Sequence, residues 1–178
     1  MTQKKIVFFL FDLTLGGTEQ VIVKLSNYLV NQDQDIHILC IGDRNDFLNK
    51  LNNKVTISNF GKKRIYESLL PLTKFIRNEE FDSFVSNVWP LTFISVVSGF
   101  FSKGFLKKLI LIEHCHLKEE FKKRGSLFKL FQKISIRVFL NFSRKVVCVS
   151  SGVQDDLVSK GVKKRKTKVI YNPAYPSQ

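Results

Sequence analysis

Short apolar runs alternate along the chain with longer segments in which apolar residues recur at helical spacing. The apolar runs predict strands at residues 6–11, 36–41, 55–57, 83–86, 109–112, 145–149 and 168–171. The periodic segments predict helices at residues 20–31, 65–78, 90–101, 126–142 and 151–160. Such alternation is typical of a parallel sheet that helices cover on both faces. We therefore predict a three-layer αβα, Rossmann-like α/β fold with a mostly parallel sheet of about six or seven strands.

Proline, serine and glycine mark several of the expected helix ends. Pro90 stands at the start of one helix, where a missing N–H costs nothing, whereas Pro71 predicts a kink in residues 65–78 or a later start. Ser150 or Ser151 can cap the helix that Gly161 ends. The 178 residues fit one domain. We expect residues 1–173 to form it and residues 174–178 to begin a linker.

Polar residues follow several of the predicted strands and should meet at one edge of the sheet, where open parallel sheets bind ligands. Gly16 and Gly17 lie between the first strand and its helix, so their backbone N–H groups suit a phosphate. A tight turn without a ligand explains the same two glycines. The other candidates at this edge are Thr18, Ser86, Asn87, Glu113, His114, Ser150 and Ser151.

Histidine and cysteine give little sign of a metal site. His114 directly follows a strand, and an imidazole pKa near 6.5 suits it for hydrogen bonding or proton transfer at neutral pH, although it can also cap a loop. His114-Cys115-His116 lacks a further cluster of ligands, so we expect neither a metal ion nor a cofactor. His37 lies within a strand and is expected to be buried. The three cysteines are far apart, which favours free thiols over disulfides.

A formal net charge of +14 is the unusual feature of the composition, and it favours anionic partners. The segment 117–144 combines phenylalanines with basic residues, among them Lys122, Lys123, Arg124, Lys129, Lys133 and Arg137. Such a helix can lie on an anionic membrane, although a solvated basic face over a phenylalanine-rich core has the same periodicity. We expect no nucleic acid, because the recognition signatures are missing, and neither G-x-G-x-x-G nor G-K-[ST] occurs. No apolar run approaches the ~18 residues that a membrane span needs.

Three stretches resemble, in order, the N-terminal domain of family 4 retaining glycosyltransferases. They are Leu15-Gly16-Gly17-Thr18-Glu19, the segment 145–153 with Asp156-Leu157 and Gly161-Val162 after it, and the closing segment 168–173. The resemblance implies a GT-B enzyme, in which two Rossmann-like halves face each other across a cleft. It implies that Gly16 and Gly17 contact the donor diphosphate and that His114, as the catalytic-site residue, lies beside the transferred sugar. Backbone amides and basic side chains stabilise the departing diphosphate in such enzymes, usually without a metal ion.

The resemblance also implies what the 178 residues lack. The paired glutamates and the basic residues that face the donor phosphates belong to the family's C-terminal domain, which this sequence does not reach. We therefore expect an acceptor-side half that is inactive alone, from an enzyme that moves sugar from a nucleotide-sugar to a lipid-linked or polysaccharide acceptor. The expected setting is lipopolysaccharide or capsule biosynthesis at the inner face of the cytoplasmic membrane, with the protein bound peripherally. A non-catalytic membrane- or polyanion-binding module on the same fold is the alternative.

Overall fold

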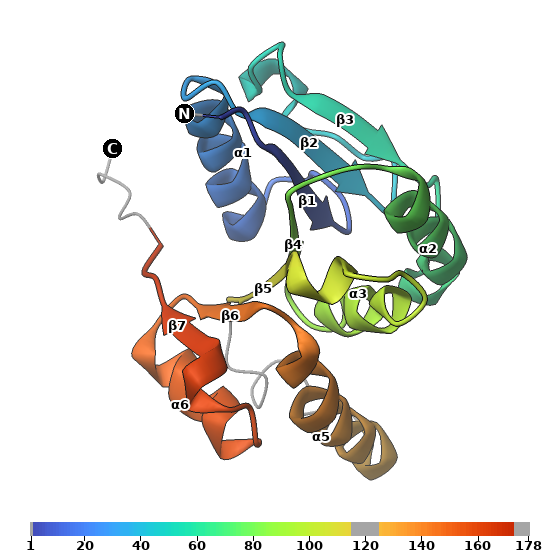
Figure 1. The fold of residues 1–178 in the computed structure, drawn as a ribbon, viewed down its shortest axis with the longest axis vertical. Helices are drawn as coiled ribbons and strands as arrows, with labels where there is room; N and C mark the ends of the chain where they lie inside the picture. Colours follow the sequence, from blue (N-terminus) through green and yellow to red (C-terminus); the bar gives the residue numbers. More distant parts are fainter. Residues whose placement is uncertain (1, 115–124, 173–178) are drawn as a thin grey trace.

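The computed structural model describes residues 2–114 and 125–172, which form one seven-stranded parallel sheet with helices on both faces (Figure 1). The strands are β1 (Lys5–Leu10), β2 (Asp35–Cys40), β3 (Thr56–Asn59), β4 (Ser83–Asn87), β5 (Leu109–Glu113), β6 (Lys145–Cys148) and β7 (Thr167–Val169). The α-helices are α1 (Gly17–Val30), α2 (Leu69–Asn78), α3 (Leu91–Gly99), α5 (Ser126–Phe139) and α6 (Ser151–Ser159). This arrangement confirms the predicted Rossmann-like class.

The strand order β3-β2-β1-β4-β5-β6-β7 places a topological switch point between β1 and β4. The chain starts in the middle of the sheet, moves outward to β3 and returns to β4, and every pair of neighbouring strands is parallel. The loops that follow β1 and β4 therefore diverge, and they leave a crevice at the carboxyl ends of the two strands.

Each face of the sheet has its own apolar core, and more helices cover one face than the other. On one face, Ile22, Val23 and Val30 of α1 pack against alternate residues of β1 and β2. The opposite core includes residues from four helices, α2, α3, α5 and α6. As a result, Ile110, Ile112 and Val147, on the α1 face of β5 and β6, are only partly buried, whereas their neighbours Leu111 and Val146 are fully buried.

Several boundaries differ from those that the sequence predicts. The first helix starts at Gly17 rather than at residue 20, which makes Gly16 its N-cap residue. The predicted helix 65–78 is a 3₁₀ turn, Ile65–Ser68, followed by α2, so that Pro71 falls in the first turn, where its missing N–H does no harm. The predicted helix 126–142 likewise ends as α5 followed by a 3₁₀ turn, Leu140–Phe142. The last strand lies at Thr167–Val169 rather than at 168–171.

Two predictions about single side chains are confirmed. His37 is buried in β2, where its Nε2 lies 2.7 Å from the Ser58 hydroxyl and where burial lowers the imidazole pKa. Cys40 and Cys148 are buried free thiols, with pKa values that burial raises to about 12 and about 11. Cys115 lies outside the described residues.

Candidate functional site

The start of α1 is an uncapped helix N-terminus at the carboxyl end of the sheet. Gly16, the N-cap residue, has extended backbone angles and no side chain that could accept a hydrogen bond from the first turn. A Cβ on Gly17 would meet no atom within 4 Å, so the space in front of this turn is open. The Glu19 carboxylate lies beside the Cα of Gly16, because a Cβ there would meet it. The first-turn N–H groups and the helix dipole thus favour an anion here, while Glu19 opposes one.

Hydrogen bonds to the loop after β2 hold the glycine loop in place. The N–H of Leu13 donates to the Arg44 carbonyl at 3.0 Å, and the N–H of Asp46 donates to the Leu13 carbonyl at 2.9 Å. The N–H of Leu15 donates to Asp46 Oδ2 at 3.2 Å. The loop is therefore fixed by main-chain bonds before any ligand arrives, which lowers the entropic cost of binding.

Asp12 holds Arg44 of the loop after β2, a role that no local sequence pattern indicates. Its carboxylate is buried, accepts the Arg44 N–H at 3.3 Å and forms an ion pair with the Arg44 guanidinium at 3.3 Å. A Cβ on Gly42 would collide with this carboxylate, so glycine is required at residue 42 unless Asp12 moves.

A cavity of about 230 Å³ joins the α1 N-terminus to the end of β4. Its lining includes Thr18 and Glu19 from α1 and Asn87, Val88 and Trp89 from the loop after β4. The Nε2 atom of His114 lies 3.5 Å from Oδ1 of Asn87. Thr18 and Asn87 line this cavity, His114 lies beside Asn87, and Gly16 and Gly17 directly precede Thr18, so the five residues lie at the same edge of the sheet.

The imidazole of His114 is neutral at neutral pH. Burial lowers its pKa from 6.5 to about 4. The low pKa disfavours proton transfer at neutral pH and leaves hydrogen bonding, the other predicted role, because the position beyond the strand is far less solvated than a loop tip. A neutral imidazole at this place can donate or accept a hydrogen bond without adding charge to the site.

Three of the residues predicted at this edge are buried; Asn87 still borders the cavity, whereas Ser86 and Glu113 do not. Ser86 is fully buried and its Oγ accepts a hydrogen bond from the Ser95 hydroxyl at 2.8 Å. Glu113 is also fully buried, and its carboxylate accepts the Trp89 N–H at 3.1 Å and the Thr92 hydroxyl at 2.8 Å. Both side chains point toward α3, because residues 86 and 113 fall on the sheet face that α3 covers.

Ser150 and Ser151 lie at the same edge, beyond β6. The Ser150 hydroxyl accepts a hydrogen bond from the Val153 N–H at 3.2 Å, which confirms Ser150 as the cap of α6. Ser151 is the first residue of α6 and is exposed. Neither serine lines the cavity at the switch point, which leaves capping as the demonstrated role of Ser150.

Val88 carries backbone strain inside the site, which periodicity could not indicate. Its φ of 57° lies in the left-handed region, which a β-branched residue rarely adopts. The strain persists because the N–H of Val88 donates to the Ile112 carbonyl at 2.8 Å and the following residue is held by Glu113. Strained residues concentrate where a site fixes its own geometry.

A second hollow borders His114 on the α1 face of the sheet. This groove of about 440 Å³ runs between α1 and the last three strands, and it is mostly apolar. Leu25, Tyr28, Ile112, Val147 and Ile170 contribute to its walls. It exists because, among the described elements, α1 alone packs on that face.

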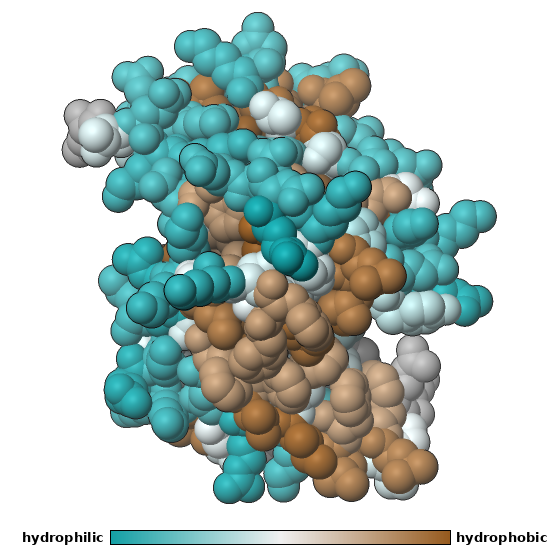
Figure 2. Space-filling view, turned by 45° about the vertical axis from the view of Figure 1, so that its right-hand side comes forward, coloured by the Kyte–Doolittle hydropathy of each residue, from teal (hydrophilic) through white to brown (hydrophobic). Residues whose placement is uncertain are grey.

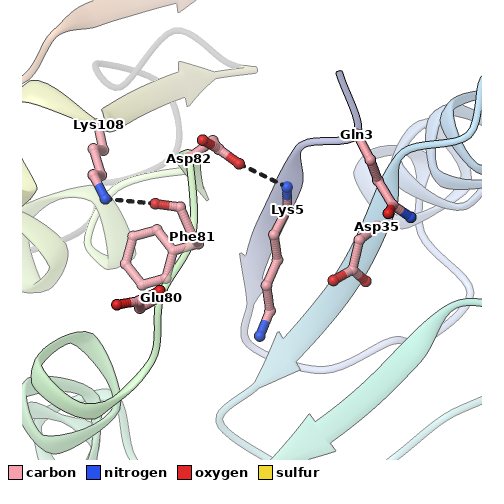
Figure 3. Close-up of a pocket in the computed structure, with 7 residues that line it drawn as sticks. All are labelled: Gln3, Lys5, Asp35, Glu80, Phe81, Asp82 and Lys108. Atoms are coloured by element: carbon pink, nitrogen blue, oxygen red, sulfur yellow. Dashed lines mark hydrogen bonds between the residues drawn. The ribbon is translucent and has the colours of Figure 1, made fainter. Parts of the chain in front are cut away.

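A third hollow lies at the opposite end of the sheet and has a different character (Figure 3). It measures about 680 Å³ and is lined by charged residues near the amino ends of β1, β2 and β4. The N–H of Lys5 donates to Asp82 and its ammonium pairs with Glu79 at 3.1 Å, while Lys108 donates to the Phe81 carbonyl. These groups bind one another across the hollow, and parallel sheets bind ligands at the other end.

The structure describes only three of the six basic residues that were predicted to face a membrane, and we call these three, on α5, the basic stripe. Lys129, Lys133 and Arg137 are exposed on successive turns of α5, whereas Lys122, Lys123 and Arg124 lie outside the described residues. Within residues 2–114 and 125–172, no three His, Cys, Asp or Glu side chains are grouped as a metal would need. Within the same ranges, no helix is long and apolar enough to cross a membrane.

Fold and site together define a Rossmann-like domain with an anion-compatible helix N-terminus at the switch point. The family model for Glycosyltransferase Family 4 matches residues 15–178, and the chain belongs to this family as an N-terminal domain. No curated protein sequence matches it.

Solved structures of larger proteins share the fold. The Anabaena protein Alr3699/HepE, solved in complex with UDP-glucose, is 17% identical with a TM-score of 0.61 over 96% of this chain and 44% of its own. A UDP-N-acetylglucosamine 2-epimerase from Rickettsia bellii is 10% identical with a TM-score of 0.60, over 94% of this chain and 44% of its own. The chain thus spans less than half of these proteins.

Proposed function

We propose that the chain is the acceptor-side half of a retaining glycosyltransferase that moves a sugar from a nucleotide-sugar to a lipid-linked or polysaccharide acceptor. The single observation that carries this proposal is the uncapped N-terminus of α1, which shares a cavity with Asn87, the partner of His114. Membership of glycosyltransferase family 4 supports the reaction class. The UDP-glucose complex of HepE supports a nucleotide-sugar as donor.

In this proposal each residue of the site has a role that its geometry allows. The N–H groups at Gly16 and Gly17 donate hydrogen bonds to the departing diphosphate, and they need no reorganisation because the loop after β2 already holds them. His114, which Asn87 orients, hydrogen-bonds the transferred sugar. Because its imidazole is neutral, it does not compete with the N–H groups of the glycines for the negatively charged diphosphate. The acceptor enters through the cavity between Thr18 and Asn87.

The donor is held chiefly by a second domain in this proposal, beyond the domain of residues 1–173. Coverage of 44% of HepE supports a partner half of similar size. The product belongs to a cell-surface glycan such as lipopolysaccharide or capsule, and the enzyme works at the inner face of the cytoplasmic membrane. The basic stripe of α5 supports that location.

Titration of the 178-residue chain with UDP, followed by amide NMR, tests the diphosphate site. We expect the amide resonances of Gly16, Gly17 and Thr18 to shift with millimolar affinity, on the order of 1 mM, because only half of the binding site is present. Shifts confined to the charged hollow at the other end of the sheet, or none at all, would contradict the proposal. Added nucleotide-sugar and lipid-linked acceptor should give no turnover with this chain alone, and brisk turnover would show that no second half is needed.

A further inference from the structure

Helix α5 presents apolar side chains to solvent, while its buried side combines polar and apolar residues. Its fully buried residues are Gln132, Ser135 and Ile136. Ser135 belongs there because its hydroxyl accepts the indole N–H of Trp89 at 3.0 Å. The exposed apolar residues, which we call the α5 apolar face, are Leu127, Leu130, Phe131, Ile134 and Val138, with 44% to 82% of each accessible. Their spacing of three and four residues puts them on one stripe of the helix.

The α5 apolar face continues onto neighbouring elements and forms a patch. Phe100 and Phe101 at the end of α3 and Phe142 after α5 are also about half exposed or more. The rings of Phe100 and Phe142 lie 5.0 Å apart, and those of Phe93 and Phe131 lie 5.4 Å apart. Figure 2 shows apolar residues gathered over one side of the molecule. Patches of this kind on a surface mark a contact with a partner or a membrane.

The charge around the patch identifies the partner. Lys129, Lys133 and Arg137 occupy the stripe between the buried side of α5 and its apolar face, and all three are exposed. None of them takes part in the ion pairs found among the described residues. Residues 121–154 contain no Asp or Glu, so α5 itself carries no acidic side chain. Aliphatic side chains beside unpaired cations suit lipid tails below anionic headgroups, whereas nucleic acid would leave the leucines and Ile134 unburied.

We propose that the α5 apolar face inserts into the headgroup region of an anionic bilayer, with the basic stripe on the lipid phosphates. A helix of 14 residues is about 21 Å long, enough to lie in the membrane plane and bury one face. This inference deepens the proposed function, since it rests on the membrane location proposed there and names the surface and the mode of binding. It requires no sugar transfer, so vesicle binding can be tested without any donor or acceptor.

Flotation of the 178-residue chain with vesicles of phosphatidylcholine and phosphatidylglycerol tests the proposal. We expect binding to anionic vesicles and roughly tenfold weaker binding to pure phosphatidylcholine. The double substitution Leu130→Glu and Ile134→Glu should abolish binding without lowering the unfolding temperature, because both side chains are exposed. Leu70→Glu is the matched control, since Leu70 is 81% exposed on α2, away from the patch, and should change nothing.

A second measurement separates insertion from surface adhesion. In Phe131→Trp, indole fluorescence should shift to shorter wavelength on adding anionic vesicles, while the buried Trp89 gives a constant background. The triple substitution Lys129→Gln, Lys133→Gln and Arg137→Gln should remove the preference for anionic lipid. The insertion proposal is overturned if the Leu130→Glu, Ile134→Glu variant still binds vesicles or if the fluorescence spectrum does not shift. It is also overturned if the chain self-associates instead of binding lipid, or if it binds RNA tightly and vesicles not at all. None of these outcomes affects the result of the UDP titration, so the membrane proposal and the proposed reaction can fail independently.

Discussion

The helices that follow β1 and β4 both begin at the switch point, yet a buried carboxylate from another strand holds the residues at the start of only one of them. The Glu113 carboxylate accepts the Trp89 N–H and the Thr92 hydroxyl at the start of α3. At the start of α1 no side chain of the described residues caps the first turn. Neither helix has a side-chain cap on its first-turn N–H groups, but Glu113 fixes the segment around the start of α3 from β5, whereas no other described strand sends a carboxylate to the first turn of α1. The difference indicates which of the two is structural and which is available to a ligand.

Removing the internal anion should have the largest effect. Glu113→Ala leaves the Trp89 N–H and the Thr92 hydroxyl without this acceptor in a buried place, which costs about 3 kcal/mol of unfolding free energy. Urea unfolding measures it. Glu113→Gln keeps an oxygen for one of the two donors and should lose about half as much. A loss below about 1 kcal/mol in Glu113→Ala would show that the carboxylate does not hold the start of α3.

The protonation state of His114 bears on the comparison between the two helix starts. A charged imidazole would itself attract the diphosphate, so the anion site would not depend on the start of α1 alone. Its folded pKa of about 4 lies below the unfolded value of 6.5, so the unfolded chain takes up the proton first as pH falls. Stability that is fully present above pH 6.5 is thus lost as pH falls toward 4, by about 2 kcal/mol after allowance for partial exposure.

Unfolding of the wild type and of His114→Gln at pH 7 and pH 5 measures this contribution. The acid loss should be smaller in the variant, and the remaining loss includes His37, whose pKa burial also lowers. An imidazole NMR titration of His114 with a midpoint near 6.5 would contradict the neutral assignment.

Blocking the open N-terminus tests the other side of the comparison. Gly17→Asp puts a carboxylate at the first turn of α1, and it should weaken UDP binding about tenfold by repulsion and by competition for the N–H groups. Gly17→Ala is the control, because a Cβ there meets nothing within 4 Å and binding should stay within about twofold. Both affinities come from the same amide titration. Equal affinities in the two variants would mean that the diphosphate binds elsewhere.

The sequence predicted the sheet, its helices and the edge of the sheet at which Thr18, Asn87 and His114 lie, because strand ends and glycines are local signals. It misplaced Ser86 and Glu113, since the face to which a residue points at a strand end depends on which helix covers that face. It could not indicate the low pKa of His114 or the strain at Val88, which arise from packing between distant segments. The α5 stripe was predicted as basic, but its exposed apolar side depends on Trp89 and Ser135 meeting across the core.

Glu19 allows the smallest and most specific test, because it is the one acid in the first turn of α1. Its carboxylate lies beside Gly16, and it weakens the field that the N–H groups offer to a diphosphate. Glu19→Gln removes this charge with little change of shape, so UDP binding should tighten about threefold, which corresponds to a typical interaction of one charge with a helix end. Glu67→Gln, in the 3₁₀ turn that precedes α2, is the control of equal charge change and should leave the affinity unchanged. If Glu19→Gln weakened binding instead, the carboxylate would be a positioning group for the glycine loop, and the open N-terminus of α1 would depend on an acid of its own, as α3 does.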